Sequence, residues 1–339
     1  MPLYRLSEGD SLDMQYTNMK RILLTGASGF VGGAVATQLL CLDAVSLVIA
    51  GRKPMPALLS PSIFVPISEI GATTDWAAAL VDVDVVVHCA ARVHVMSDKA
   101  SNPLTEFRRV NVAGTLNLAR QAMLAGVKRF IYISSIKVNG ECTFSNQPYR
   151  ADDDLAPLDP YGVSKMEAEQ GLRLLVAETG MEVVIIRPTL VYGPGVKANF
   201  LNMMRWLYKG VPLPFGAIHN RRSLVALDNL VDLIVTCLDH PGAANQAFLV
   251  SDGEDLSTTE LFRRMLIVLG KPAWLLPVPS RLLEAGAVIL GKQALAQRLC
   301  GSLQGDITKT RSLLNWSPPV SVDEALRKTA KHFLEQQAK

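Results

Sequence analysis

Three side chains in the middle of the chain have the types and spacing needed for proton transfer: Ser135, Tyr161 and Lys165. Tyr161 and Lys165 are four residues apart and follow Pro160, which can begin a helix, so we expect both on one helical face. A tyrosine with an ordinary pKa of about 10 is a poor base at neutral pH. A nearby lysine ammonium, together with the positive charge of a second reactant beyond it, stabilises the phenolate and lowers that pKa. Ser135 would hold the reacting oxygen by a hydrogen bond. Because a Tyr-x-x-x-Lys spacing is frequent by chance, this assignment depends on the elements around it.

A glycine turn at residues 25–32 would position a second reactant beside these side chains. It follows the apolar run 21–24, which is typical of a buried parallel strand, and it precedes apolar residues at helical spacing. Glycines in such a turn let the backbone approach a pyrophosphate and direct the free N–H groups of the helix toward it. The candidate cofactor contacts in this turn are Gly26, Ser28, Gly29, Phe30, Val31 and Gly32.

The rest of the first half alternates strand-like apolar runs with helical segments. Strands that alternate with helices predict an α/β fold with a Rossmann-type doubly wound parallel sheet. Ligands of such sheets bind beyond the carboxyl ends of the strands. The later strands are expected at residues 45–50, 64–67, 84–91, 129–134 and 182–187.

Several polar or small residues stand at these strand ends. Glu69 could reach an adenine amino group, and Ala90, Ala91 and Ser134 would let a cofactor approach closely. The candidates for the wall of a substrate pocket, with surface positions as the alternative, are Arg92 and His94.

The end of the second strand bears on the choice of dinucleotide. In such folds this strand usually ends in an acid that binds the adenosine 2′-OH, but no Asp or Glu occurs between Asp43 and Glu69. Arg52 and Lys53 stand there instead, and two cations suit a 2′-phosphate through charge-assisted hydrogen bonds. A solvated basic loop is the alternative. We therefore expect NADP(H) as cofactor, with NAD(H) as the other option.

Length limits the domain organisation. A chain of 339 residues can bury one large core or two unequal ones. We expect a disordered N-terminal extension at residues 1–18 and an NAD(P)-binding domain at 19–188, to which segments around 223–250 return. Residues 189–339 would mainly form a smaller, interleaved α/β lobe that binds substrate.

Composition narrows the classes of partner. The net charge of +3 and the lack of a basic run give no reason to expect nucleic acid. The most apolar helix candidate, residues 282–290, is too short to insert across a membrane. The five scattered cysteines lack metal-ligand spacing, which predicts reduced thiols in a cytoplasmic protein and no metal site.

Taken together, the motifs resemble the NAD-dependent epimerase/dehydratase family of nucleotide-sugar enzymes, in the extended branch of the short-chain dehydrogenase/reductase superfamily. The likeness runs from Lys20 to about Phe333 and begins with the glycine turn. Its later landmarks are His88 to Ala91, Asn111 to Thr115, Ser134 to Gly140, Tyr161 to Lys165, Arg187-Pro188, Tyr192 to Gly195, Asp306 to Lys309 and Leu314 to Trp316.

This resemblance implies a UDP- or dTDP-linked sugar held by the C-terminal lobe. An arginine fork would bind the diphosphate oxygens bidentately, although a surface salt bridge is the alternative for each arginine. On the cofactor side the resemblance adds Asn111, Pro188 and Val191, and on the substrate side the candidates are Lys137, Asn199, Arg222 and Arg298.

Two departures narrow the subclass. Ile136-Lys137 follow Ser135 where the 4,6-dehydratases of the family carry an Asp-Glu pair, which removes that acid/base chemistry. Asn139 replaces the tyrosine of the family's Val-Tyr-Gly. Segments 90–96, 134–140 and 220–225 are similar to a UDP-glucose 4-epimerase-like subgroup, which includes a reductase that forms UDP-N-acetylquinovosamine.

These observations lead to three hypotheses. The first is NAD(P)H-dependent reduction of the C4 ketone of a UDP-4-keto-6-deoxy-N-acetylhexosamine, for bacterial surface polysaccharide such as lipopolysaccharide O-antigen. The alternative is a 4-epimerase of a UDP-hexose or UDP-N-acetylhexosamine, with the same residues and a retained NAD. The third is a regulatory protein that senses the cofactor without turnover. Such sensors typically lose the Tyr/Lys pair, so the presence of Ser135, Tyr161 and Lys165 argues against this hypothesis. The sugar, its C4 configuration and the oligomeric state, a homodimer included, stay open.

Overall fold

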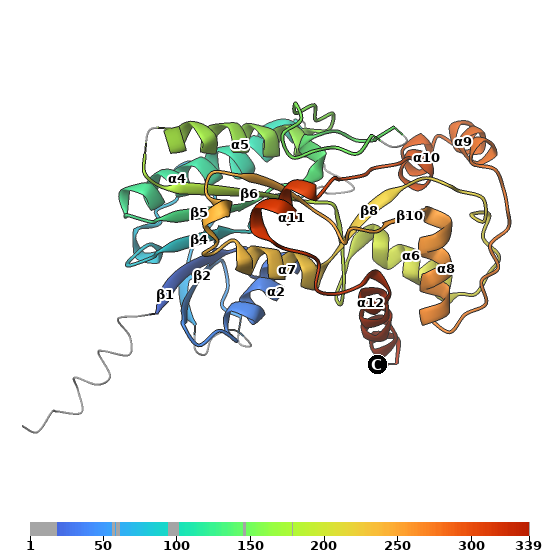
Figure 1. Cartoon of the computed structure of the whole chain (residues 1–339), viewed down its shortest axis with the longest axis horizontal. Coiled ribbons are helices and arrows are strands. Elements are labelled where there is room, and N and C mark those ends of the chain that lie inside the picture. Colours follow the sequence, from blue (N-terminus) through green and yellow to red (C-terminus); the bar gives the residue numbers. More distant parts are fainter. Residues whose placement is uncertain are drawn as a thin grey trace, which may run out of the picture.

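The computed structural model describes residues 19–55, 58, 62–93, 102–144, 147–177 and 179–338. The expected N-terminal extension, residues 1–18, and the pocket candidate His94 lie outside these described residues. A large sheet with helices on its two faces lies beside a smaller lobe (Figure 1).

Seven parallel strands form the large sheet, in the order β3-β2-β1-β4-β5-β6-β9. The order reverses between β1 and β4, as in a doubly wound sheet, so the predicted fold class is confirmed. Ligands of such sheets bind at this reversal, beyond the carboxyl ends of the strands. The strands are β1 (Lys20–Thr25), β2 (Val45–Gly51), β3 (Ile63–Pro66), β4 (Val85–His88), β5 (Arg129–Ile133), β6 (Glu182–Pro188) and β9 (Ala247–Val250).

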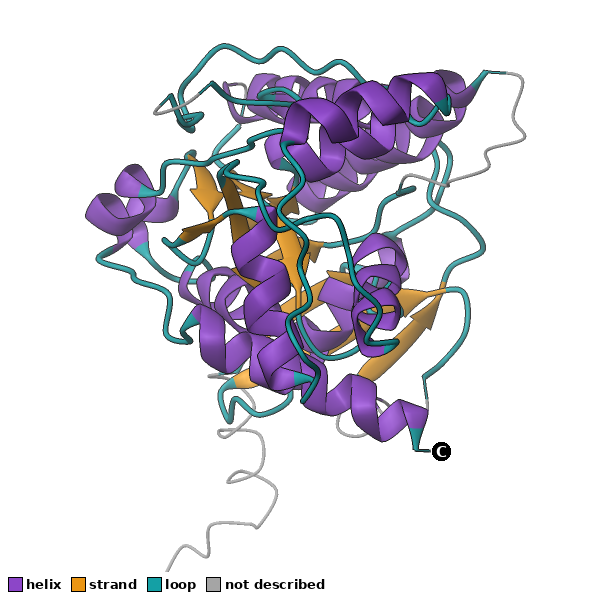
Figure 2. Ribbon diagram, turned by 90° about the vertical axis from the view of Figure 1, so that its right-hand side faces the viewer, coloured by secondary structure: helices purple, strands orange, loops and turns teal. Residues whose placement is uncertain are grey.

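Alternate residues of each strand pack against different helices, because neighbouring side chains point to opposite faces of the sheet. Ile22 and Leu24 of β1 lie in the core with α2 and α7, whereas Leu23 lies in the core with α4 and α5. A view turned by 90° shows the strands between helices (Figure 2). Burial on both faces explains why these strands are continuously apolar. The four helices are α2 (Phe30–Leu39), α4 (Thr115–Leu124), α5 (Pro160–Ala177) and α7 (Leu227–Thr236).

The smaller lobe is built on a three-stranded sheet in the order β10-β8-β7. Phe200, Met265 and Leu326, from three helices far apart in the sequence, meet in its core. Within residues 223–250, β9 pairs with β6 of the large sheet and α7 packs against that sheet, whereas β8 pairs with β7 in the small sheet. The lobe's elements are β7 (Leu190–Tyr192), β8 (Arg222–Ala226), β10 (Asp255–Leu256), α6 (Ala198–Tyr208), α8 (Thr258–Val268) and α12 (Val322–Gln337).

Residues 302–306 tie the two parts together. Ser223 of β8 donates its backbone N–H to the Leu303 carbonyl at 2.9 Å, and Tyr149, in the loop after β5, donates to the Gln304 carbonyl at 2.9 Å. The lobe is therefore fixed against the carboxyl edge of the large sheet. The remaining helical elements are η2 (Ala77–Ala79), α3 (Pro103–Phe107), the π-helix η3 (Arg108–Gly114), η4 (Ile136–Val138), η5 (Pro241–Ala243), α9 (Ser280–Ile289), α10 (Gln293–Cys300) and α11 (Thr308–Leu314).

The turn between β1 and α2 requires glycine at two positions. Gly26 has φ +78°, and a Cβ there would lie 2.6 Å from the backbone nitrogen of Ala90. A Cβ on Gly32 would lie 2.2 Å from the carbonyl oxygen of Gly26. The first turn of α2 thus packs directly on the turn that follows β1, which is the tight bend that the glycines predict.

We expect Gly32→Ala to lower the free energy of unfolding by about 1–3 kcal/mol, the usual cost of overpacking a tight site. The matched control is Gly286→Ala in α9, where an added Cβ meets nothing within 4 Å. That change should be neutral or stabilise the protein, by up to about 1 kcal/mol. Urea unfolding of both variants measures this, and equal stability of the two would contradict the close approach.

Candidate active site

Helix α5 carries two of the predicted catalytic residues on the side that faces the sheet. Asp159 precedes the helix and accepts the backbone N–H of Gly162 at 2.6 Å. A Cβ on Gly162 would lie 2.9 Å from the carbonyl oxygen of Lys137, so the first turn of α5 packs on the segment after Ser135. The structure therefore brings the Ser135 segment against the helical turn that bears Tyr161.

Ser135 lies directly after β5 and begins the short helix η4. Its Oγ accepts the backbone N–H of Lys137 at 3.2 Å, which orients the side chain at the end of the strand. Ser135 and Tyr161 are both half-buried, so both side chains are accessible from the carboxyl edge of the sheet. A hydroxyl held in this way can donate a hydrogen bond to a substrate oxygen.

Lys165 lies one turn farther along α5 and is buried. Its Nζ donates to the carbonyl of Ile133 at 2.8 Å, and it lies 4.5 Å from the centroid of the Tyr132 ring and 6.0 Å from that of Tyr161. Burial lowers the pKa of Lys165 to about 8. Burial, followed by the negative charge of Asp159, raises the pKa of Tyr161 above its ordinary value.

In the protein without a cofactor, Lys165 therefore does not lower the pKa of Tyr161. The reason is that the Lys165 ammonium is directed at a backbone carbonyl of β5 rather than at the phenol oxygen. Desolvation of the phenol then outweighs the attraction of the cation. A phenolate at Tyr161 needs additional positive charge at this edge of the sheet. The predicted lowering, which also counts a positive nicotinamide beyond Lys165, stays a prediction.

A buried ion pair holds β5, β6 and α5 together beneath these residues. Glu169, four residues after Lys165, pairs with Arg187 of β6 at 2.6 Å, and the two side chains are 0% and 2% exposed. The Ser134 hydroxyl donates to Glu169 at 2.5 Å. The hydroxyl of Ser134, a predicted cofactor contact, is therefore buried and bonded to Glu169.

Asn139, the departure from the family's tyrosine, joins the same network. Its Oδ1 accepts from Arg187 Nη1 at 3.4 Å, and its Nδ2 donates to the carbonyl of Arg150 at 3.1 Å. Arg187 also donates to the carbonyl of Ala151 at 2.8 Å. An amide is suited to this position because it can accept from the arginine and donate to the loop at once.

Asn111 lies in the π-helix η3 and holds the loop after β4. It accepts the backbone N–H of Arg92 at 2.8 Å and donates to the Arg92 carbonyl at 3.0 Å. It also donates to Ser164 of α5 at 3.0 Å, and Ser164 donates to the carbonyl of Tyr161 at 2.8 Å. Asn111 thus links the loop after β4 to the catalytic helix, and π-helical turns often occur at functional sites.

The residues around the β1–α2 turn fit a dinucleotide. The first turn of α2 carries no acid, and its N-cap Gly29 makes no side-chain hydrogen bond, which leaves helix N–H groups for an anion. Beneath the turn, His88 bonds to the hydroxyls of Thr25 at 2.7 Å and Thr115 at 3.0 Å. Burial lowers the pKa of His88 to about 3, so this histidine is neutral and structural.

The other predicted cofactor residues lie at the carboxyl ends of the strands. Arg52 and Lys53 are exposed directly after β2, and Ala90 and Ala91 are half-buried after β4. Glu69, beyond β3, is exposed and pairs with Arg109 at 2.8 Å. Its predicted contact with adenine would have to compete with this ion pair. The remaining two are Pro188, which ends β6, and Val191 in β7.

The predicted substrate residues have different surroundings. Lys137 is engaged in ion pairs with Glu141 and Asp159, both at 2.7 Å, rather than extended toward a substrate. Asn199 is exposed in the first turn of α6. Arg92 stacks on the Phe107 ring at 5.7 Å, and this ring in turn meets the edge of Tyr161.

Arg222 and Arg298 lie close to each other. Arg222 Nη1 donates to the carbonyls of Arg298 at 2.8 Å and Gly301 at 3.1 Å, at the end of α10. Burial and then the charge of Arg298 lower the pKa of Arg222 below its ordinary value. Two neighbouring guanidinium groups that repel each other form a place where an anion is favoured.

Sequence reasoning missed Glu169 and Asp159 as parts of this site. Two signals were available. Glu169 continues the four-residue spacing of Tyr161 and Lys165, which places a carboxylate on the buried face of α5, and Arg187 stands inside an otherwise apolar strand. A buried acid and a buried base in neighbouring elements need each other.

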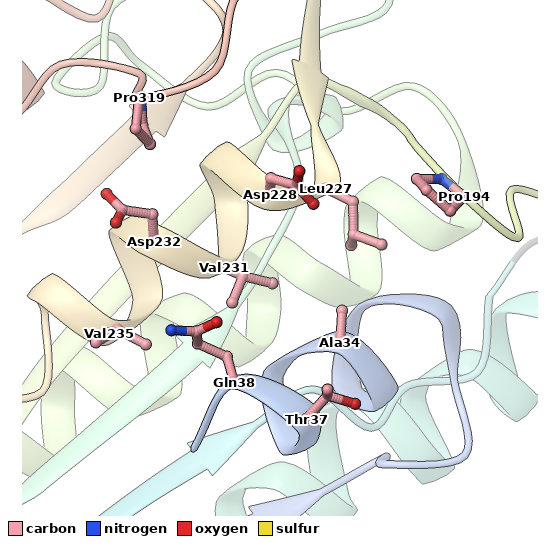
Figure 3. Close-up of a pocket in the computed structure, with 10 residues that line it drawn as sticks. All are labelled: Ala34, Thr37, Gln38, Pro194, Leu227, Asp228, Val231, Asp232, Val235 and Pro319. Atoms are coloured by element: carbon pink, nitrogen blue, oxygen red, sulfur yellow. The ribbon is translucent and has the colours of Figure 1, made fainter. Parts of the chain in front are cut away.

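A separate hollow of about 440 Å³ lies between α2 and α7. Figure 3 shows Thr37 and Gln38 of α2 facing the side of α7 that carries Asp232. None of the predicted catalytic residues lines it. Its acids have partners elsewhere, since Asp228 pairs with Lys328 and Asp232 accepts from the Trp316 indole. We therefore do not assign it to the active site.

Known proteins resemble this chain over nearly its whole length. A sequence model of the NAD dependent epimerase/dehydratase family matches residues 22–251. The chain is 52% identical to a UDP-glucose 4-epimerase of Vibrio cholerae, over 93% of this chain and 96% of that protein. It is 29% identical to the N-acetyl-alpha-D-glucosaminyl-diphospho-ditrans,octacis-undecaprenol 4-epimerase of Escherichia coli O157:H7, over 92% and 94% of the two chains.

A solved structure supports the fold. The UDP-glucuronic acid 4-epimerase from Bacillus cereus, in complex with NAD, matches with a TM-score of 0.75 and 24% identity. The match covers 94% of this chain and 100% of the Bacillus cereus chain.

We expect Glu169→Gln to lower the free energy of unfolding by about 3–5 kcal/mol, because Arg187 would be left as an uncompensated buried charge. The control is Glu260→Gln on α8, which removes the partner of Arg263 and Arg264 at the surface. That change should cost at most about 1 kcal/mol. Urea unfolding gives both values, and a small loss for Glu169→Gln would show that the pair does not hold the site together.

Proposed function

The chain belongs to the NAD-dependent epimerase/dehydratase family, and on this basis we propose that it is a 4-epimerase of a UDP-linked hexose or N-acetylhexosamine with a retained NAD. The likeness to the Vibrio cholerae UDP-glucose 4-epimerase carries the proposal, because it extends through the C-terminal lobe that would hold the sugar. The similar proteins include the 4-epimerases of Vibrio cholerae and Escherichia coli O157:H7, which favours epimerisation over the 4-keto reduction that the sequence first suggests.

The site residues fit a reversible oxidation at sugar C4. When bound, NAD would accept the C4 hydride and return it to the opposite face of the sugar. Tyr161 would take the proton of the C4 hydroxyl and give it back, while Ser135 holds that oxygen. Because burial raises the pKa of Tyr161, proton removal needs positive charge in addition to that of Lys165, which is protonated below its pKa of about 8. The nicotinamide of bound NAD would add that charge.

The small lobe would bind the nucleotide diphosphate. Arg222 is held by backbone carbonyls of α10 rather than by a carboxylate, so its charge is available to an anion beside Arg298. Asn199 stands in the same lobe at the start of α6. We place the enzyme in the cytoplasm, where its five free cysteines would stay reduced. The homodimer stays a prediction.

One observation favours a second candidate function, the NADPH-dependent 4-keto reductase. Arg52 and Lys53 are exposed at the end of β2, and no acid replaces them to bind a free ribose hydroxyl. Two cations would attract a 2′-phosphate, although exposed charges are screened by salt. Reduction would use Ser135, Tyr161 and Lys165 in the same roles.

We expect Tyr161→Phe to lower the rate of interconversion of UDP-glucose and UDP-galactose, or of their N-acetyl forms, by roughly a hundredfold or more. The change deletes the hydroxyl that transfers the proton and leaves the ring packed on Phe107. The control is Tyr208→Phe, whose ring packs on Phe333 in the small lobe. NAD binding should persist in both variants, and near-normal turnover of Tyr161→Phe would remove Tyr161 from the mechanism.

The nucleotide that copurifies with the protein separates the two functions. We expect heat denaturation to release stoichiometric NAD. A protein that copurifies without nucleotide and binds NADPH more tightly than NADH would instead support the reductase. In that case the double variant Arg52→Ala with Lys53→Ala should bring the two dissociation constants closer together. Arg327→Ala with Lys331→Ala, two exposed cations on α12, is the matched control for net charge.

A further inference from the structure

Helix α9 has an apolar surface without a partner in the described structure. Not one of its ten residues is buried, although it contains a run of aliphatic side chains. Leu282, Val288, Ile289 and Leu290 are 64%, 55%, 85% and 71% exposed. A short helix in water is stabilised mainly by packing of its apolar face, so a helix without buried residues needs another environment for that face.

The segment that leads into α9 and the one paired with it also carry exposed apolar side chains. The Leu213 N–H donates to the Trp274 carbonyl at 2.9 Å, which joins the loop after α6 to the segment that leads into α9. In Figure 1, α9 lies at the outer end of the small lobe, next to α10. We define the α9 surface as Trp206, Val211, Trp274, Leu276, Leu282, Val288, Ile289 and Leu290, each between 43% and 85% exposed.

The same segments are strongly basic. Residues 205–218 and 271–300 together carry six Lys or Arg and one acid, Glu284. The whole chain has a net charge of +3, so the rest of it is net negative. The cations are Arg205, Lys209, Lys271, Arg281, Lys292 and Arg298.

Two of these cations lie over aromatic rings. Lys209 is 4.4 Å from the centroid of Trp206, and Lys271 is 4.4 Å from that of Tyr208. Exposed tryptophan, aliphatic residues and a rim of Lys and Arg are the features of a surface that enters the headgroup region of a membrane. Among the residues that the structure describes, no helix is both long and apolar enough to cross a bilayer.

We propose that the α9 surface docks on an anionic phospholipid membrane, with α9 lying flat in the headgroup region. The aliphatic residues of α9 and the two tryptophans would enter the interface. The five cations other than Arg298, which lies beside Arg222, would meet lipid phosphates. The inference is independent of the proposed function.

Charge argues against the other occupants of this surface. A two-fold homodimer would place the basic surface against itself, and like charges across an interface repel. Nucleic acid would leave the aliphatic centre of the surface in water, because its backbone contacts are polar. An anionic bilayer offers phosphates and an apolar layer together.

The test is flotation of the full-length protein with vesicles. We expect binding to vesicles of phosphatidylcholine mixed with phosphatidylglycerol, weaker binding at high salt, and little binding to phosphatidylcholine alone. Ile289→Glu and, separately, Lys292→Glu should each weaken binding roughly tenfold or more. Equal binding to both vesicle types, or no binding, would overturn the proposal.

Matched controls keep the result specific. Ile267→Glu on α8 exposes the same new charge in the same lobe, at a residue 66% exposed outside the α9 surface. Lys331→Glu on α12 makes the same charge reversal as Lys292→Glu. Both should bind vesicles as the unchanged protein does, and equal unfolding midpoints show that all variants fold. A dimer in sedimentation that Ile289→Glu dissociates, without vesicle binding, would assign the surface to a second copy of this chain instead.

Discussion

The buried ion pair between Arg187 and Glu169 is the interaction on which the candidate active site depends. Removing two charges from water is costly, and the cost is offset only when the remaining donors and acceptors find partners. The chain supplies these partners from Ser134 at the end of β5, from Asn139 and from the carbonyl of Ala151. The pair is therefore satisfied only when strand, loop and helix α5 are all in place. Folding itself therefore fixes the positions of β5, the loop after it and α5, and with them the candidate catalytic residues.

The electrostatics of Tyr161 and Lys165 result from the same enclosure. Burial raises the pKa of Tyr161 and lowers that of Lys165, so desolvation favours the neutral form of each group in the protein alone. Lys165 donates to Ile133 instead of pairing with the phenol. A phenolate would thus be stable only while positive charge and the sugar oxygen lie beside it. This restricts proton transfer to a site that holds both reactants.

The parts of the structure that depend on short-range spacing could be predicted from the sequence. The glycine turn, the individual strands and the shared face of Tyr161 and Lys165 are of this kind, because each needs only a few neighbouring residues. The parallel pairing of the strands follows from their alternation with helices. The surroundings of Ser134, Lys137 and Arg222 could not be predicted in this way. Their partners are Glu169, Asp159 and the end of α10, 22 to 79 residues away along the chain. The type of a side chain shows which groups it can bind, but the fold determines which of those groups lie next to it.

Epimerisation and reduction place the same demands on Ser135, Tyr161 and Lys165, and they differ in the steps after hydride transfer. An epimerase must keep its dinucleotide and let the sugar present its other face, whereas a reductase must release the dinucleotide. The glycine turn would serve both, because it would bind the pyrophosphate of the dinucleotide in either reaction. We therefore expect the difference at the exposed end of β2 and in the lobe proposed to hold the sugar. A 52% identical relative whose likeness extends through that lobe is accordingly more informative about the reaction than the three candidate catalytic side chains.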